Sequence, residues 1–261
     1  MSGASGGGRL RGRTAVVTGA GGGIGRGIAL ALAAEGASVV IAARRLVTGE
    51  ETAALIRAEQ GEALALECDV SRQSQVDAAI TAIIDAYGAL DIVVHNANAS
   101  DSAMPVAFEA ITDANWMSQA AVAWDAAFFL AQAAHVHLKK SGRGRFIMLG
   151  SCFGLHGAAM NPIYSALKGG DRGFVKALAR EWGPDGITVN AIEPAAATEP
   201  TEVFFNQYPE VRAKYLANFP MGRLGRPRED IGRAVAALCF DDFGFITAQS
   251  IQVDGGLYTA L

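Results

Sequence analysis

Residues 14–35 read TAVVTGAGGGIGRGIALALAAE, and this stretch decides the fold. A β-branched strand over residues 14–18 leads straight into a glycine turn and then into an apolar helix over residues 24–35. Gly19 permits the tight turn, Gly23 lets the backbone approach a pyrophosphate, and Gly25 allows close packing of the helix. Free N–H groups at the helix start favour an anion there. The order of strand, glycine turn and helix therefore predicts a dinucleotide-binding unit rather than a ligand-free flexible turn.

Short β-branched runs alternate with longer helical stretches along the rest of the chain, which predicts a parallel sheet covered by helices on both faces. The expected strands are residues 14–18, 38–42, 63–68, 91–95, 145–149, 188–192 and 250–253. The expected helices are residues 24–35, 49–60, 74–87, 116–139, 164–182 and 229–240. Gly36, Gly61 and Gly88 stand where helix ends need a left-handed residue. We expect a Rossmann-type, doubly wound α/β sheet of about seven strands, with its ligand crevice at the carboxyl ends of the strands.

The length of 261 residues, of which 51% are hydrophobic, suits a single domain with one large core. We expect residues 1–9 to form a flexible N-terminal tail and residues 10–261 to form that domain. The 22 Lys and Arg against 26 Asp and Glu give a net charge of −4, without a long block of like charge. This balance argues against nucleic acid or an anionic membrane as the main partner.

The sequence also bears on location and on metals. Its apolar stretches fall short of the ~20 residues that a membrane span needs, and the first residues lack the apolar core of a signal peptide. We therefore expect a cytoplasmic protein. The three cysteines form no CxxC pair and the four histidines have no ligand spacing, so we expect reduced thiols and no metal site.

Further motifs follow the glycine turn in a fixed order. They are CDV at residues 68–70, HNAN at 95–98, GSCFG at 150–154, YSALK at 164–168, VNAIEP at 189–194 and VDGG at 253–256. With the TGxxxGxG spacing at residues 18–25, they resemble the short-chain dehydrogenase/reductase family over about residues 10–257. The resemblance implies an NAD(P)-dependent oxidoreductase that interconverts a secondary alcohol and a ketone. The cofactor-binding residues that it implies are Thr18, Gly19, Gly23, Ile24, Gly25, Arg44, Asp69, Val70, Asn96, Ala97, Tyr164 and Lys168.

The end of the second strand bears on the choice of cofactor. Ala43 stands where NAD-binding members of the family place Asp, and Arg44 and Arg45 follow it. Without the acid a 2′-phosphate is not repelled, and an arginine can pair with it bidentately. We therefore predict NADP rather than NAD. The opposing observations are that Gly22 stands where many NADP-using relatives have a basic residue, and that both arginines can simply be solvated.

Two pairs of residues are expected to hold the adenosine half of the cofactor. Asp69 and Val70 match the family pair that contacts the adenine ring, although Asp69 is also placed to cap the next helix ahead of Ser71. Asn96 and Ala97 match the middle of the family motif that supports the adenosine and the central sheet.

The expected catalytic residues are Ser151, Tyr164 and Lys168. Tyr164 and Lys168 are four residues apart, so on a helix both point the same way, and the lysine ammonium favours the phenolate form of the tyrosine. Ser151 ends the strand over residues 145–149, where the family places its substrate-orienting serine. Tyr164 would act as general acid/base. The alternative readings are an ordinary helix surface pair and a serine that only ends a strand.

The chain departs from the family pattern in four places. Ala123, seven residues after Trp116, replaces an asparagine that in relatives shapes a helix bulge whose carbonyl holds a relay water next to the lysine. Asn98 and Ala195 replace family glycines, and Asn98 is still able to adopt a positive φ. Thr198 stands one residue short of the usual threonine. These departures favour a second hypothesis, a dinucleotide-binding regulatory or scaffolding protein with little catalysis.

Substrate contacts and assembly are open at this stage. His156 and Met160 lie between Ser151 and Tyr164 and either line the substrate pocket or merely pack. The segment 198–220 is dense in aromatic residues, which fits either a substrate lid for a moderately apolar substrate or packing against the body. The apolar helices over residues 120–139 and 164–182 resemble those that pair across subunits in family members, which implies a homotetramer.

Overall fold

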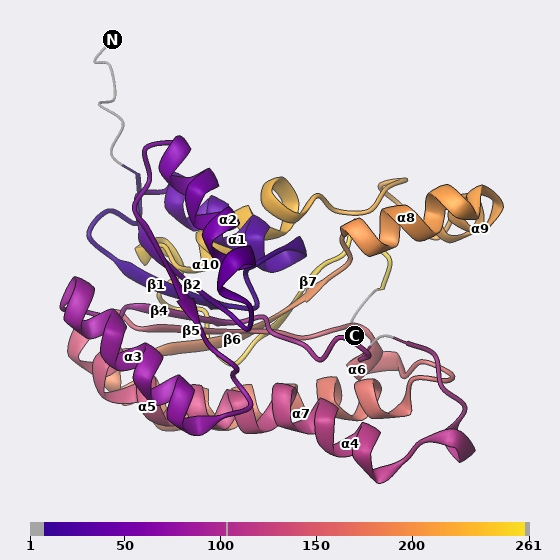
Figure 1. Cartoon of the computed structure of the whole chain (residues 1–261), viewed down its shortest axis with the longest axis horizontal. Coiled ribbons are helices and arrows are strands. Elements are labelled where there is room, and N and C mark those ends of the chain that lie inside the picture. Colours follow the sequence, from indigo (N-terminus) through magenta and orange to yellow (C-terminus); the bar gives the residue numbers. More distant parts are fainter. Residues whose placement is uncertain (1–7, 103, 259–261) are drawn as a thin grey trace.

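The computed structural model describes residues 8–102 and 104–258, and its centre is a seven-stranded, all-parallel sheet (Figure 1). The strands are β1 (Thr14–Thr18), β2 (Ser38–Ala43), β3 (Ala63–Glu67), β4 (Ile92–His95), β5 (Arg145–Leu149), β6 (Thr188–Pro194) and β7 (Ser250–Val253). Their order in the sheet is β3-β2-β1-β4-β5-β6-β7. The order reverses between β1 and β4, which is where doubly wound sheets open a ligand crevice. The predicted Rossmann-type α/β fold is confirmed, while residues 1–7 of the expected tail lie outside the described residues.

Helices cover both faces of the sheet, with α1, α2 and α10 on one side and α3, α5 and α7 on the other (Figure 1). The α-helices are α1 (Gly23–Ala34), α2 (Leu46–Ala58), α3 (Gln73–Tyr87), α4 (Asp113–Ala120), α5 (Ala126–Ser141), α6 (Phe153–His156), α7 (Pro162–Trp182), α8 (Glu199–Gln207), α9 (Pro209–Leu216) and α10 (Arg233–Leu238). Within residues 8–102 and 104–258, none of the helices is both long and apolar enough to cross a membrane.

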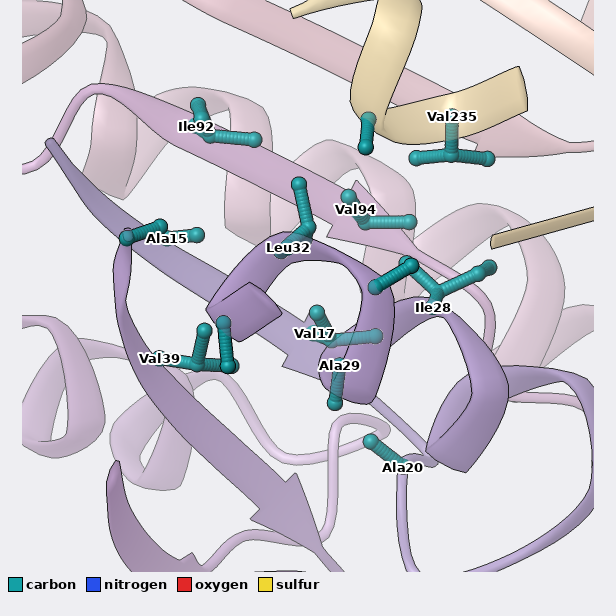
Figure 2. Close-up of a cluster of buried hydrophobic side chains, with 14 of the residues drawn as sticks. Ala15, Val17, Ala20, Ile28, Ala29, Leu32, Val39, Ile92, Val94 and Val235 are labelled. Carbon is teal, nitrogen blue, oxygen red and sulfur yellow. The ribbon is translucent and has the colours of Figure 1, made fainter. Parts of the chain in front are cut away.

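The core fixes α1 against the middle of the sheet. Figure 2 shows Ile28, Ala29 and Leu32 of α1 lying over apolar side chains of β1, β2 and β4, with Val235 of α10 beside them. All of the labelled side chains are buried. Burial of a Leu or Ile side chain stabilises a fold by about 1.5–3 kcal/mol, so the glycine turn between β1 and α1 is held by a rigid framework.

Two of the three glycines expected at helix ends have the left-handed backbone, and the third does not. Gly36 and Gly88 have φ of 87° and 74°. After α2, however, Gln60 takes the left-handed conformation with φ of 64°, and Gly61 does not. A Cβ atom on Gly61 would lie 2.7 Å from Cγ2 of Ile56, so this glycine is required by close packing and not by its φ.

Two expected helices are interrupted by π-helical turns. The stretch predicted as one helix over residues 116–139 consists of α4, a π-helical segment over Ala121–Asp125 and α5. The helix predicted over residues 229–240 begins with a π-helical segment over Pro227–Gly232 and ends with α10 at Leu238. A π-turn inserts extra backbone into a helix and is frequent at functional sites. The first of these segments carries Ala123.

Candidate functional site

A cleft of about 860 Å³ lies along the carboxyl ends of β1, β2, β3 and β4. The predicted cofactor residues that line it are Gly19, Gly23, Arg44, Asp69, Val70, Asn96 and Ala97. The other predicted cofactor residues are not among its lining residues; they are Thr18, Ile24, Gly25, Tyr164 and Lys168. Thr18 and Gly25 are buried behind the turn, so they shape the cleft without facing it.

The glycine turn has the geometry that a phosphate group needs. Gly19 and Gly23 have φ of 65° and 53°, a conformation that favours glycine. A Cβ atom on Gly22 would meet nothing within 4 Å, so the backbone there faces the cleft. The N-terminus of α1 has no side-chain cap, which leaves its N–H groups available to an anion. A Cβ on Gly25 would lie 2.4 Å from Nδ2 of Asn96. The third position of the motif therefore has no room for a side chain.

Asn96 holds the glycine turn against β4. Its Nδ2 donates to the carbonyl oxygens of Thr18 and Gly19 at 3.0 and 3.2 Å. The backbone N–H groups of Asn96 and Ala97 both donate to Oγ1 of Thr18 at 3.1 Å. These bonds join the end of β1 to the end of β4, so Asn96 supports the central sheet. Its expected support of the adenosine stays a prediction.

The same network fixes the tautomer of His95, which the sequence analysis did not single out. Oγ1 of Thr18 accepts from two N–H groups, so its own proton goes to Nδ1 of His95, 3.1 Å away. Nε2 then carries the imidazole proton and donates it to the carbonyl oxygen of Ala123 at 3.2 Å. Burial lowers the pKa of His95 to about 4, and the charge of Lys168 adds to the effect. His95 is therefore neutral at pH 7.

Two arginine side chains add positive charge to the wall of the cleft. Ala43 is buried, whereas the side chains of Arg44 and Arg45 are exposed, and all three residues line the cleft. Arg26 lines the cleft as well. The sequence analysis did not predict it as a cofactor residue, although it directly follows the glycine motif. Its guanidinium donates to Gly21 O at 2.6 Å and pairs with Glu51 at 3.0 Å. These contacts connect the glycine turn to α2.

Asp69 does not cap the next helix, and that alternative was wrong. The helix α3 begins at Gln73 with Arg72 as its N-cap. Asp69 instead accepts the N–H and the hydroxyl of Ser71 at 3.1 and 2.7 Å, an Asx turn that leaves the residue on the cleft wall. The hydroxyl of Ser71 is also the largest cause of the lowered pKa of this carboxyl group.

The three predicted catalytic residues lie on two neighbouring elements. Ser151 directly follows β5, while Tyr164 and Lys168 lie in the first turns of α7. A Cβ atom on Gly154 would lie 2.4 Å from the backbone of Lys168, so the segment after Ser151 packs directly on α7. Phe153 meets the Tyr164 ring edge-on, with 6.1 Å between centroids. The structure thus brings the serine segment against the helix that carries Tyr164 and Lys168.

Lys168 is buried, with only 4% of its side chain exposed. Its Nζ donates to Leu149 O at 2.6 Å and to Asp171 Oδ2 at 3.2 Å, and it lies 5.7 Å from the centre of the Tyr164 ring. Burial alone lowers the pKa of this ammonium, but the carboxylate of Asp171 and a further contribution from Tyr164 outweigh it, and the net pKa is raised. Lys168 is therefore a fixed positive charge next to the tyrosine. Asp171 was missed because no family motif includes it.

A small pocket of about 120 Å³ adjoins Tyr164, and Met160 lines it together with Asn161 and Ile163. His156 is not among its lining residues and stacks on Tyr258 at 4.7 Å between centroids. The aromatic residues of segment 198–220 lie on α8 and α9 or directly next to them. Phe205 and Phe219 are buried, and Tyr208 and Tyr215 are partly exposed. Their rings contact one another in a continuous series.

The departures from the family pattern have distinct outcomes. A helix bulge is present at Ala121–Asp125 without the asparagine, and Trp124 within it donates from Nε1 to Leu167 O on α7 at 3.0 Å. The carbonyl of Ala123 accepts from His95. Asn98 has no positive φ, and Thr198 lines the cofactor cleft beside Gly23.

Comparisons with known proteins agree with this geometry. A family model described as Enoyl-(Acyl carrier protein) reductase matches residues 19–258. The chain is 33% identical to a 12alpha-hydroxysteroid dehydrogenase of Clostridium sp. over 253 residues, covering 94% of this chain and 96% of the relative. It is 36% identical to the 3-oxoacyl-[acyl-carrier-protein] reductase FabG of Haemophilus influenzae, covering 95% and 99%. A crystal structure from Sinorhizobium meliloti 1021, described as a short-chain alcohol dehydrogenase, superimposes with a TM-score of 0.88 at 35% identity, covering 95% and 97%.

Proposed function

Because the chain belongs to the short-chain dehydrogenase/reductase family, whose members oxidise alcohols or reduce carbonyls with NAD(P), we propose that it is an NADP-dependent oxidoreductase that interconverts a secondary alcohol and a ketone. Tyr164 acts as its general acid/base, Ser151 orients the substrate and Lys168 holds the cofactor ribose. Residues 10–261 act as a single catalytic domain.

One observation carries this proposal, namely the buried lysine beside the tyrosine. Lys168 Nζ lies 5.7 Å from the centre of the Tyr164 ring, and an ammonium held this close favours the phenolate over the phenol. The tyrosine adjoins a small pocket, and the glycine-lined cleft runs along neighbouring strand ends. A substrate in that pocket would lie beside Tyr164.

In the proposed reaction, Ser151, Tyr164 and Lys168 have different roles. The bound nicotinamide supplies the hydride acceptor or donor. The Ser151 hydroxyl donates a hydrogen bond to the substrate oxygen, and Tyr164 takes the alcohol proton during oxidation or gives it back during reduction. Lys168 stabilises the phenolate by its charge. NADPH consumption by the wild-type protein with a panel of oxosteroids, 3-oxoacyl thioesters and aryl ketones tests this assignment, and no consumption with any of them would contradict it.

The preference for NADP is supported by positive charge on the wall of the cleft. Arg44 and Arg45 line it while Ala43 presents no acid. Replacing Arg44 with Ala is expected to raise the Kd of NADPH by about 10- to 150-fold, because an arginine–phosphate bond contributes about 1.5–3 kcal/mol. The Kd of NADH should not change, since NADH has no 2′-phosphate. Fluorescence titration of both reduced cofactors measures this, with the exposed Arg57→Ala on α2 as the control. Tighter binding of NADH than NADPH by the wild-type protein would contradict the assignment.

A moderately apolar substrate is supported by the lining of the pocket beside Tyr164, which includes Met160 and Ile163. The aromatic series on α8 and α9 serves as the substrate lid over about residues 198–220. The relatives act on steroid and acyl substrates according to their names, which defines the panel of test ketones without fixing the natural substrate.

A second candidate function has one observation in its favour. The Ala123 carbonyl, at the position where the family resemblance places a relay water, already accepts one hydrogen bond, from His95. A dinucleotide-binding regulatory or scaffolding protein would tolerate this change, because it needs no proton exchange. It would bind NADPH and reduce none of the panel ketones.

Assembly into a homotetramer is supported by an apolar groove between α5 and α7, lined by Trp124, Phe128 and Phe174. Trp124 and Phe128 have exposed fractions of 38% and 48%, and exposed aromatic residues of this kind typically mark protein contacts. Light scattering is expected to give the mass of four 27.1 kDa chains. Phe128→Glu, which places a charge in the groove, should give smaller species, whereas Phe245→Glu at a fully exposed ring should not. A monomeric wild-type protein would contradict the tetramer.

A further inference from the structure

A buried histidine joins the π-helical segment Ala121–Asp125 to the sheet. Nε2 of His95, the last residue of β4, donates to the carbonyl oxygen of Ala123 at 3.2 Å. Nδ1 of the same ring accepts from the Thr18 hydroxyl at 3.1 Å. Only 4% of His95 is exposed. Because both ring nitrogens have partners in a buried site, the imidazole has a fixed orientation, and so has the carbonyl that it holds.

The side chains of the segment contact α7. Ala123 forms a small apolar cluster with Ile163 and Leu167, and Nε1 of Trp124 donates to Leu167 O at 3.0 Å. A Cβ atom on Gly170 would lie 2.4 Å from Cζ2 of Trp124, so α7 lies directly against the tryptophan ring. The segment thus contacts His95 through its backbone and α7 through its side chains.

The part of α7 in this contact is the part that carries two of the expected catalytic residues. Ile163 directly precedes Tyr164, and Leu167 directly precedes Lys168. Ile163 and Leu167 are only 5% and 1% exposed. Protein interiors are close-packed and transmit displacements from one side chain to the next. A shift of the segment would therefore be passed on to Tyr164 and Lys168.

The side chain of Ala123 supplies no polar group to hold the bulge. The family resemblance places an asparagine at this position, and that side chain shapes the bulge in relatives. Alanine has no donor or acceptor beyond its backbone, yet the π-helical turn is present. His95 reaches the turn through a backbone carbonyl, which does not depend on the side chain of Ala123.

We propose that His95 is a positioning residue, which holds the π-helical segment through the Ala123 carbonyl and so keeps Tyr164 in place for the reaction. The inference rests on the proposed function, in which Tyr164 is the acid/base. His95 itself moves no proton in this role, because both of its ring nitrogens are engaged. Thr18, which holds the same imidazole, directly precedes the glycine turn, so the cofactor cleft and the catalytic helix share one support.

Two substitutions of His95 separate its two hydrogen bonds. Asn places its amide near the position of Nδ1, so it keeps a partner for Thr18 but does not reach Ala123. Gln places an amide N–H near the position of Nε2, so it keeps the bond to Ala123 and loses the one to Thr18. If His95 served stability alone, both variants would be affected alike, because each loses one buried hydrogen bond.

The rate of ketone reduction is expected to depend on the bond to Ala123. With the fastest ketone of the panel, His95→Asn should lower kcat by about 10- to 100-fold, since a misplacement of about 1 Å can reduce a rate ~100-fold. KM and the Kd of NADPH should not change. His95→Gln should keep kcat within about 3-fold of the wild type. His137→Asn, a partly exposed change on α5, is the matched control and should not lower kcat.

Hydrogen exchange measured by mass spectrometry follows the segment without a substrate. The backbone amides of residues 121–125 should exchange faster in His95→Asn than in the wild type, and His95→Gln should exchange like the wild type. If His95→Asn does not fold, nitrogen NMR of the wild-type protein at pH 7 gives the second measurement. The imidazole signals that His95→Gln lacks should show the proton on Nε2, because Nδ1 accepts from Thr18. A proton on Nδ1 would overturn the inference.

The outcomes for this inference and for the proposed function are distinct. A loss of kcat in His95→Gln as large as that in His95→Asn would overturn the positioning role, as would a His95→Asn protein with the kcat of the wild type. Wild-type protein that reduces none of the ketones would overturn the proposed function instead. Hydrogen exchange of residues 121–125 would then still show whether His95 holds the segment.

Discussion

Tyr164→Phe is expected to lower kcat for ketone reduction by about 10³-fold, within the range of 10²–10⁴ that general acid/base groups contribute. The substitution removes only the hydroxyl group that transfers the proton. The ring keeps its edge-on contact with Phe153, 6.1 Å between centroids, so the fold and the affinity for NADPH should be retained.

Steady-state rates with the fastest panel ketone measure this loss, and fluorescence titration checks the binding of NADPH. Tyr87→Phe at the end of α3 removes a hydroxyl group far from the site and should leave kcat unchanged. A Tyr164→Phe protein as active as the wild type would show that another group transfers the proton.

Lys168→Met is expected to reduce both activity and stability. Lys168 and Asp171 are buried, with exposed side-chain fractions of 4% and 1%. Removing the ammonium leaves the Asp171 carboxylate buried without its partner, and breaking such a pair costs about 3–5 kcal/mol of the free energy of unfolding. It also removes the charge that stabilises the Tyr164 phenolate, so kcat should fall as well.

Urea unfolding of four proteins separates these effects: the wild type, Lys168→Met, Asp171→Asn and the double variant. The double variant should recover part of the lost stability, because it no longer buries an unpaired charge, but it should not recover kcat. Lys176→Met, an exposed change on the same helix, controls for the loss of a lysine. Equal unfolding free energies for Lys168→Met and Lys176→Met would contradict the buried ion pair.

The fold could be predicted because its determinants are local in the sequence. The run from Thr14 to Glu35 contains strand, glycine turn and helix together, and the continuous apolar strands indicate a sheet buried on both faces. The ends of helices were predicted less accurately where tertiary packing overrides the local conformational preference of a residue. At the end of α2, Gln60 takes the left-handed conformation because Gly61 must pack against Ile56.

The candidate site was predictable only where a motif names its residues. Tyr164, Lys168 and the glycine turn were found through spacing, and their roles stay predictions. His95 was missed because its contacts are with distant parts of the chain, such as the carbonyl of Ala123. Asp171 was missed although it lies on the same helix as Lys168, three residues further along. The π-helical segment at Ala121–Asp125 likewise has no local sequence signal, since its residues are ordinary helix formers.

The most direct measurement of the central claim uses NADPH that carries deuterium at its transferable hydride. Incubated with the wild-type protein and the panel ketones, it is expected to yield an alcohol with one deuterium on the former carbonyl carbon for each NADPH consumed. Tight binding of NADPH without any transfer of label to any of the ketones would contradict the account and would favour a binding protein without catalysis.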